Sequence, residues 1–299
     1  MLVFLPVFVR LPLALLLVVL NVLAHAVVLF ALAALKALLP IAPIRRALSR
    51  ALIVIAEQWI AVNGWLFGLF TPTQWRIEGL EGLHRDGWYL VLSNHQSWVD
   101  IPVLQKTFNR RIPFLRFFLK KQLIWVPVLG LAWWALDFPF MQRHTKETLK
   151  RHPELRNQDK EATRKACERF RESPVSVMNF VEGTRFRTHK HERQQSPFAH
   201  LLRPRAGGVA FVLETMGEML QSIIDVTIVY PDGRPTMIDL LAGRVRRICV
   251  HVRQLPIPAE FIGGDYENDA EYRKRFHRWM TALWSEKDAL ITKLQTQAS

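Results

Sequence analysis

The N-terminal part of the chain is a nearly continuous run of apolar residues. From Leu11 to Leu35 there are 25 residues without a formal charge, between Arg10 and Lys36. As a helix this run would be about 37 Å long, which exceeds the roughly 30 Å hydrocarbon core of a bilayer. The pattern predicts an uncleaved membrane helix, although Ala24-His25-Ala26 also resembles the cleavage site of a secretory signal peptide.

Two further apolar stretches follow. Residues 51–70 carry only Glu57 as a charge, and the pattern favours a helix that lies in the membrane interface or returns to its own side. Residues 122–140 are broken by Pro127, Gly130 and Pro139, which favours a buried or membrane-touching part of a folded domain over a third crossing helix. We therefore assign residues 1–72 to an N-terminal membrane-anchoring helical region.

From about Thr73 short β-rich runs alternate with helical periodicity. This alternation predicts an α/β fold with a mixed, mostly parallel sheet flanked by helices. The expected strands are residues 88–93, 175–180, 225–230 and 247–252. The expected helices are residues 97–109, 157–172, 208–220 and 268–295. Residues 73–299 are thus expected to form one α/β domain that ends in an amphipathic helix, either an ordinary one or one that lies on a membrane.

The charge balance points to a partner that carries phosphates. Forty Lys and Arg against 26 Asp and Glu give a net charge of +14, which suits nucleic acid or an anionic bilayer surface. Ten tryptophans favour the bilayer, because indole rings settle at the level of the headgroups. Nucleic acid is therefore not an expected partner. Cys167 and Cys249 lack metal-ligand spacing, and no metal site is expected.

The basic residues near the first apolar run predict its orientation. Arg45, Arg46 and Arg50 follow the run, whereas Arg10 alone precedes it. Because basic residues are retained on the cytoplasmic side, the C-terminal part of the chain is expected in the cytoplasm. The predicted location is a cytoplasmic (inner) membrane with the α/β domain on its cytoplasmic face.

The first candidate site follows the expected strand at residues 88–93. Asn94-His95 comes directly after this strand, and Asp100 stands where the next helix should begin. On one continuous helix, residues 95 and 100 would not share a face. In a strand–turn–helix arrangement the carboxylate can reach back and hold one imidazole nitrogen, so that the other can accept a proton. The alternative is that Ser97 and Asp100 form a helix-capping box without catalytic significance.

A second candidate site follows the expected strand at residues 175–180. Val181 is followed by Glu182-Gly183-Thr184-Arg185, so polar groups and a glycine again end a buried strand. Polar groups at the carboxyl ends of inner strands face a cleft in α/β sheets. Arg185 offers the bidentate donors that suit a phosphate, and Gly183 allows a ligand or backbone to come close. The alternative is a surface turn with an ion pair.

These stretches together resemble the four-motif pattern of the glycerolipid acyltransferases, in particular the lysophosphatidic acid and lysophospholipid acyltransferases. The motifs are Asn94-His95 with Asp100, Arg143 after an apolar run, Glu182-Gly183-Thr184-Arg185, and Ile228-Val229-Tyr230-Pro231. The resemblance covers roughly residues 75–255. The family usually has an aliphatic residue where Tyr230 stands.

The resemblance implies a reaction and roles for these residues. His95 would be the general base that deprotonates the free hydroxyl of a lysophospholipid, and Asp100 would orient its imidazole. Arg143 and Arg185 would bind the acceptor phosphate, while Glu182 and Thr184 would position the glycerol. The acyl donor would be a thioester of coenzyme A or of acyl carrier protein, with no covalent acyl-enzyme and no further cofactor.

Two other classes of protein fit parts of the pattern. A membrane-anchored protein that binds anionic lipid without catalysis would have the same charge and the same apolar N-terminus. A lipase or esterase would need an activated nucleophile, but the sequence contains no Gly-x-Ser-x-Gly stretch. The acyltransferase is therefore the leading hypothesis.

Overall fold

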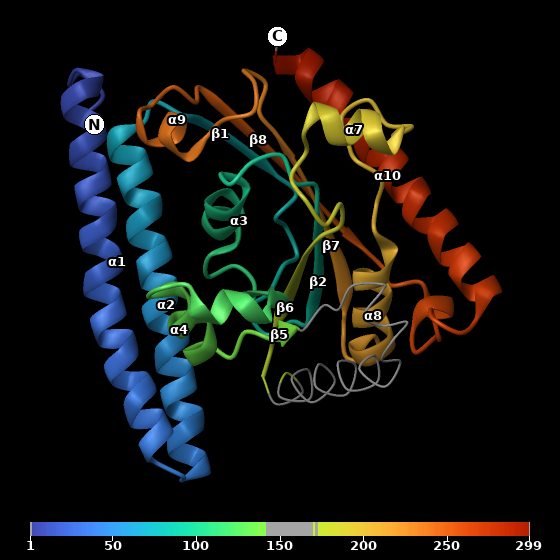
Figure 1. Cartoon of the computed structure of the whole chain (residues 1–299), viewed down its shortest axis with the longest axis horizontal. Coiled ribbons are helices and arrows are strands. Elements are labelled where there is room, and N and C mark those ends of the chain that lie inside the picture. The colour runs from blue at the N-terminus through green and yellow to red at the C-terminus, as the bar shows by residue number, and fades with distance from the viewer. Residues whose placement is uncertain (1, 142–169, 171–172, 299) are drawn as a thin grey trace.

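The N-terminal region is a pair of antiparallel helices that lies beside the rest of the chain (Figure 1). The computed structural model describes residues 2–141, 170 and 173–298. Helix α1 (Val7–Leu38) and helix α2 (Ala42–Phe70) are both long and apolar enough to cross a membrane. They are joined midway by a hydrogen bond of 2.9 Å from Asn21 Nδ2 to Asn63 Oδ1.

Helix α2 begins well before the predicted start at residue 51. Arg45, Arg46 and Arg50, which follow the first apolar run, lie in the first turns of α2. Pro43 is in the first turn of α2, where its missing N–H leaves no bond unmade. The basic residues therefore belong to the hairpin itself.

The α/β domain is built on a six-stranded sheet of order β1-β8-β7-β2-β6-β3. All neighbouring strands are parallel except β7 and β8, so the predicted mixed, mostly parallel sheet is confirmed. The four expected strands are all present, and the short strands at either edge were not predicted. The strands are β1 (Gln74–Glu78), β2 (Tyr89–Ser93), β3 (Leu115–Phe117), β6 (Ser176–Phe180), β7 (Ser222–Val229) and β8 (Arg247–Leu255).

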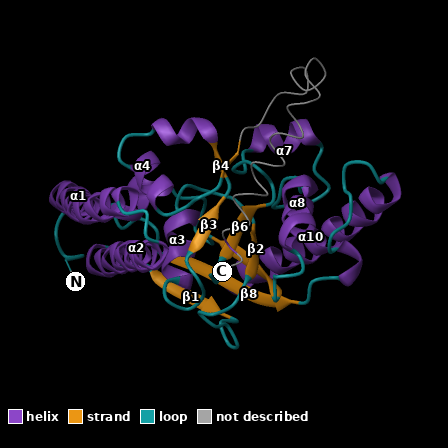
Figure 2. Ribbon diagram, turned by 90° about the horizontal axis from the view of Figure 1, so that it is seen from below, coloured by secondary structure: helices purple, strands orange, loops and turns teal. Residues whose placement is uncertain are grey.

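Helices cover both faces of this sheet, and Figure 2 shows the strands between them. Helices α3 (Asp100–Phe108) and α9 (Met237–Leu241) lie on the side of the hairpin, and α8 (Ala206–Met216) and α10 (Ala270–Ala298) lie on the other side. All five residues of β2 are buried, because alternate side chains enter two different cores. The continuous apolar run that precedes His95 is thus an inner strand.

Three of the four expected helices are confirmed as α3, α8 and α10. Helix α10 buries Tyr272, Phe276 and Met280 in the core against the sheet, so it is an ordinary amphipathic helix of the domain. The expected helix at residues 157–172 lies, apart from Phe170, outside the described residues, and so does Arg143.

The apolar stretch at residues 122–140 forms no long helix. It contains the 3-10 helix η1 (Lys121–Trp125) and the seven-residue helix α4 (Leu129–Ala135), and it ends in β5 (Phe140–Met141), which pairs with β4 (Leu119–Lys120). The backbone takes positive φ angles at Val128 and Asp137, which breaks helical continuity. The alternative of a third crossing helix is therefore excluded, and the stretch is part of the folded domain, as the sequence favoured.

A buried cluster of charges fixes α10 to the middle of the sheet. Lys287 Nζ on α10 lies 2.6 Å from Asp225 Oδ1 on β7, and both side chains are fully buried. Lys287 also donates to the carbonyl of Val226, and Arg253 on β8 lies 2.8 Å from Asp225 Oδ2. Burial lowers the pKa of Lys287, and the charge of Asp225 opposes this shift. The cluster lies on the strand that leads to Tyr230.

We expect Lys287→Met to lower the free energy of unfolding by about 3 kcal/mol, because it leaves buried negative charge only partly compensated. The measurement is chemical denaturation of the full chain in detergent. Lys274→Met is the matched control: its salt bridge with Glu271 is exposed, and we expect a change below about 0.5 kcal/mol. Equal effects of the two substitutions would contradict this account.

Candidate active site

The register of the sheet brings the two candidate sites together. Strands β2 and β6 are parallel neighbours, and Ser93 pairs with Phe180 at their carboxyl ends. The turn after β2 carries His95, and the turn after β6 carries Glu182. Two backbone hydrogen bonds connect these turns, from Val181 N–H to the Ser93 carbonyl and from Phe186 N–H to the His95 carbonyl.

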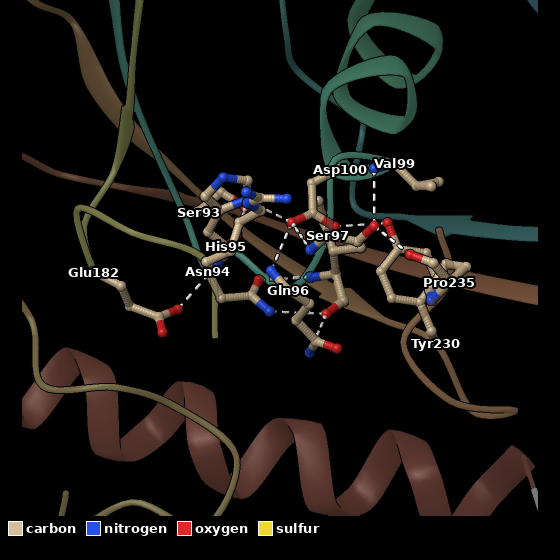
Figure 3. Close-up of polar contacts among 12 residues, drawn as sticks. Ser93, Asn94, His95, Gln96, Ser97, Val99, Asp100, Glu182, Tyr230 and Pro235 are labelled. Atoms are coloured by element: carbon tan, nitrogen blue, oxygen red, sulfur yellow. Dashed lines mark hydrogen bonds and ion pairs between the residues drawn. The ribbon is translucent and has the colours of Figure 1, made fainter. Parts of the chain in front are cut away.

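His95 and Asp100 are in direct contact (Figure 3). Nδ1 of His95 lies 2.8 Å from Oδ2 of Asp100, and the two side chains are 12% and 0% exposed. The imidazole lies flat on the ring of Phe180, with 3.9 Å between the ring centroids and 14° between the planes. Since a carboxylate can only accept, Nδ1 carries the proton in this contact. The lone pair of the neutral imidazole is then on Nε2.

Asp100 is held by four donors. Its Oδ2 accepts from the His95 ring and from the backbone N–H groups of Gln96 and Ser97, at 2.6 and 2.9 Å. Its Oδ1 accepts from the hydroxyl of Tyr230, at 2.6 Å. The carboxylate also stands at the N-terminus of α3, where a negative charge is favourable. These contacts fix the carboxylate in one orientation.

The alternative that Ser97 and Asp100 form a helix-capping box is correct in part. Asp100 accepts from the N–H of Ser97, as in a capping box, but the Ser97 hydroxyl accepts from the N–H of Val99. The reciprocal bond from Asp100 N–H to that hydroxyl is replaced by a bond to the Ser97 carbonyl. Asp100 therefore closes the turn that precedes its helix and holds the imidazole with the same oxygen.

Glu182 supports the His95 turn from the other side. Its Oε1 accepts from the backbone N–H of His95 at 3.0 Å, and its Oε2 accepts from that of Leu202 at 2.9 Å. The side chain is 1% exposed. Burial raises the pKa of Glu182 to about 7, although these two backbone hydrogen bonds act to lower it. Both oxygens are thus occupied by backbone groups rather than directed at open space.

The other residues of the Glu182 turn also have identified contacts. Gly183 has φ 66°, and an added Cβ would lie 2.8 Å from Cδ of Arg205. Lys190 Nζ donates to the hydroxyl of Thr184. The Arg185 guanidinium lies over the ring of Trp98, 4.4 Å from its centroid. Arg185 and the His95 loop are therefore neighbours.

Three residues with a place in this site were not assigned a role by the sequence. Asn94 exchanges two hydrogen bonds of 2.9 Å with the backbone of Ile228, and so extends the pairing of β2 with β7. Tyr230 bonds to Asp100. Arg234 lies over the ring of Phe186, 3.7 Å from its centroid. The sequence signals were the Asn94-His95 motif and the apolar run that ends at Tyr230-Pro231, and neither of them pointed to Arg234.

Among the described residues, no group of three His, Cys, Asp or Glu side chains could hold a metal ion. The site has instead the parts of an acid–base centre: an imidazole with a fixed tautomer, a buried orienting carboxylate, and guanidinium groups close by.

Comparisons with known proteins find acyltransferases. Curated relatives include the 1-acyl-sn-glycerol-3-phosphate acyltransferase delta of Homo sapiens, 23% identical over 257 residues, which are 81% of this chain and 60% of the relative. The gamma enzyme of Mus musculus is 25% identical over 215 residues, 67% of this chain and 52% of the relative. The chain thus spans about half to three-fifths of the length of these relatives.

Among solved structures, that of the 1-acyl-sn-glycerophosphate acyltransferase PlsC from Thermotoga maritima matches this chain. It is 17% identical, the match covers 90% of this chain and 96% of that one, and the TM-score is 0.48. The family model named Acyltransferase matches residues 74–231, which is more than half of the chain and includes both turns of the site. The chain belongs to the acyltransferase family.

Proposed function

We propose that this protein is a membrane-attached O-acyltransferase. It transfers a fatty acyl chain from an acyl thioester to the free hydroxyl of lysophosphatidic acid or a related lysophospholipid. The observation that carries the proposal is the 2.8 Å contact between His95 Nδ1 and Asp100 Oδ2, inside the segment that matches the family model. The names of the curated relatives support the acceptor class.

The chemistry follows from the tautomer of His95. Its free Nε2 takes the proton of the acceptor hydroxyl as the oxygen attacks the thioester carbonyl. The carbon–sulfur bond then breaks, and the leaving thiolate takes that proton back from the imidazolium. Asp100 stabilises the imidazolium through the bond to Nδ1. No acyl-enzyme forms, and the donor is a thioester of coenzyme A or of acyl carrier protein.

The acceptor phosphate is bound by arginine in this proposal. The Arg185 guanidinium is stacked on Trp98, so its planar edge is oriented at little cost in side-chain entropy. Arg143 is assigned to the same phosphate on the family motif. Thr184 is assigned to the glycerol.

Glu182 has a different role from the glycerol contact that the motif suggested. Because both of its oxygens accept backbone N–H groups, we assign it to holding the His95 turn in place. A carboxylate can accept both bonds at once, whereas an amide side chain has one acceptor oxygen.

The helical hairpin attaches this domain to the membrane along its length. At one end of α1, Arg10 donates to the carbonyl of Ala242, beside α9, and at the other end Lys36 lies 2.7 Å from Asp137, beside α4. These contacts are about 39 Å apart along the helix, which exceeds the roughly 30 Å hydrocarbon core. The domain accompanies α1 over this whole distance. We therefore place the hairpin along the bilayer surface, on the cytoplasmic side of an inner membrane where acyl thioesters occur.

We expect His95→Ala and Asp100→Asn each to lower the transfer rate by at least about 100-fold, since one removes the base and the other its carboxylate. The assay follows a radiolabelled acyl chain from coenzyme A or acyl carrier protein to lysophosphatidic acid. His277→Ala, an exposed histidine on α10, is the control and keeps full activity.

Full activity in His95→Ala would remove the assigned base. A parent protein that binds anionic vesicles but turns over neither thioester would instead be the non-catalytic lipid-binding protein.

A second prediction concerns Glu182 and pH. Its pKa is about 7 in the folded protein against an ordinary value of 4.5, so the folded state binds more protons between these values. The free energy of unfolding therefore falls as pH rises from about 4.5 to about 7, by up to about 3 kcal/mol. Glu182→Gln removes this contribution, so the free energy of unfolding falls less steeply with pH over this range. Chemical denaturation at several pH values measures it.

Glu271→Gln on the exposed start of α10 is the control and keeps the parent's slope. An unchanged slope in Glu182→Gln would show that the buried carboxyl is not the titrating group.

A third prediction concerns the hairpin. In a chain with both native cysteines replaced, Pro40→Cys at the exposed tip and Glu271→Cys on the domain are labelled by a membrane-impermeant maleimide. We expect labelling of both from the same side of sealed vesicles, because a hairpin along the surface keeps its tip on the side of the domain. Labelling of position 40 from the opposite side only would show that the hairpin crosses the bilayer.

A further inference from the structure

The hydroxyl of Tyr230 bonds to the one oxygen of Asp100 that His95 leaves free. His95 uses Oδ2, and the phenol lies 2.6 Å from Oδ1 (Figure 3). Tyr230 is 4% exposed and follows directly after β7. It lies in the hydrophobic core on the hairpin side of the sheet. The contact joins residues 130 positions apart in the chain. No local turn chemistry explains it.

The phenol is the donor in this contact. Burial raises the pKa of Tyr230 well above 10, and the negative charge of Asp100 raises it further. The group therefore keeps its proton throughout the range in which a histidine base works. A buried phenol next to a carboxylate donates a charge-assisted hydrogen bond, which is stronger than a neutral one.

The position of Tyr230 is imposed by its surroundings. Strand β7 is paired on both sides, with β2 and with β8, and Asn94 continues the pairing as far as Ile228. After Tyr230 the chain turns at Pro231, with a bond from Gly233 N–H to the Tyr230 carbonyl. The phenol thus reaches Asp100 from a rigid element.

We propose that Tyr230 is a positioning residue of the His95–Asp100 pair, an inference that rests on the proposed function. Its hydrogen bond fixes the carboxylate plane with Oδ2 toward Nδ1. It also takes up part of the negative charge of Asp100, so the carboxylate binds the imidazolium less tightly. Loss of the phenol would therefore strengthen the hold of Asp100 on the protonated ring of His95.

Other charged groups around the pair come from several elements. Glu182 approaches from the turn after β6, and Arg234 from the loop after β7. Arg185 lies in the loop after Glu182, and Lys190 lies in helix α7 (Thr188–Gln194). The positive charge of Lys287 on α10 acts to lower the pKa of Glu182. Removal of the Tyr230 hydroxyl leaves all of them in place, so a change in pH dependence reports on the phenol.

The test is Tyr230→Phe, which removes one oxygen atom and keeps the ring in the core. In the parent and the variant, kcat/KM and kcat are measured against pH with lysophosphatidic acid and an acyl thioester. We expect the acidic limb of both pH profiles to move to higher pH by about one unit. A shift of this size corresponds to the loss of one hydrogen bond to a charged group. We also expect kcat to fall several-fold while the KM values for both substrates stay unchanged.

Tyr89→Phe is the matched control. Tyr89 is a buried phenol of the same core, but its oxygen accepts from the backbone N–H of His84 and does not touch Asp100. We expect its pH profile to coincide with that of the parent. Coincident profiles for Tyr230→Phe and the parent, or the same displacement in Tyr89→Phe, would overturn the proposal.

A second measurement does not depend on turnover. With isotope-labelled histidine, NMR titration of the His95 ring in detergent should show protonation persisting to higher pH in Tyr230→Phe than in the parent. An unchanged titration overturns the role of Tyr230 even if the enzyme is active. If the parent lacks transferase activity but the titration moves, the proposed function fails while the coupling of phenol, carboxylate and imidazole stands.

Discussion

A single buried carboxylate sets the geometry on which the rest of the site depends. Asp100 is fully buried, and burying an unpaired carboxylate would cost several kcal/mol. Four donors offset this cost: the His95 ring, two backbone N–H groups, and the Tyr230 hydroxyl. They come from the turn after β2 and from the end of β7, so the need to satisfy one charge ties these two segments together. The same requirement leaves the imidazole with one tautomer and one free nitrogen.

The sheet makes this arrangement possible because its central strands are parallel and end at one edge. Strand β2 lies between β6 and β7, so the residues that follow all three strands meet there. Glu182 arrives from β6 and Tyr230 from β7, and each hydrogen-bonds a different part of the His95–Asp100 segment. Ligands of open α/β sheets bind outside the carboxyl ends of the strands, where side chains are free of the ladder. The polar groups of this site therefore lie at the edge of the sheet where ligands bind in such folds.

The sequence revealed what local patterns encode. Strand–turn–helix periodicity was enough to bring Asp100 back to His95, because only five residues separate them. The bond between Tyr230 and Asp100 spans 130 residues and depends on the register of β7 against β2, which no local pattern specifies. The same holds for Glu182, whose motif suggested a ligand contact but whose oxygens accept backbone N–H groups. The edge strands β1 and β3 were missed because they have only five and three residues, and two alternating apolar side chains in each are too few to indicate a strand.

The hairpin and the site are connected through α9. Arg10 at the start of α1 donates to the carbonyl of Ala242 at the end of α9, and Ser97 in the His95 loop donates to the carbonyl of Pro235 just before α9. The edge of the domain next to these contacts exposes large apolar side chains at Trp98, Met237 and Ile238. A hairpin that lies along the bilayer surface would therefore hold this edge, and the His95 turn behind it, at the level of the headgroups. The acceptor could then present its hydroxyl to Nε2 while its acyl chain stays in the lipid, which removes the cost of extracting it into water.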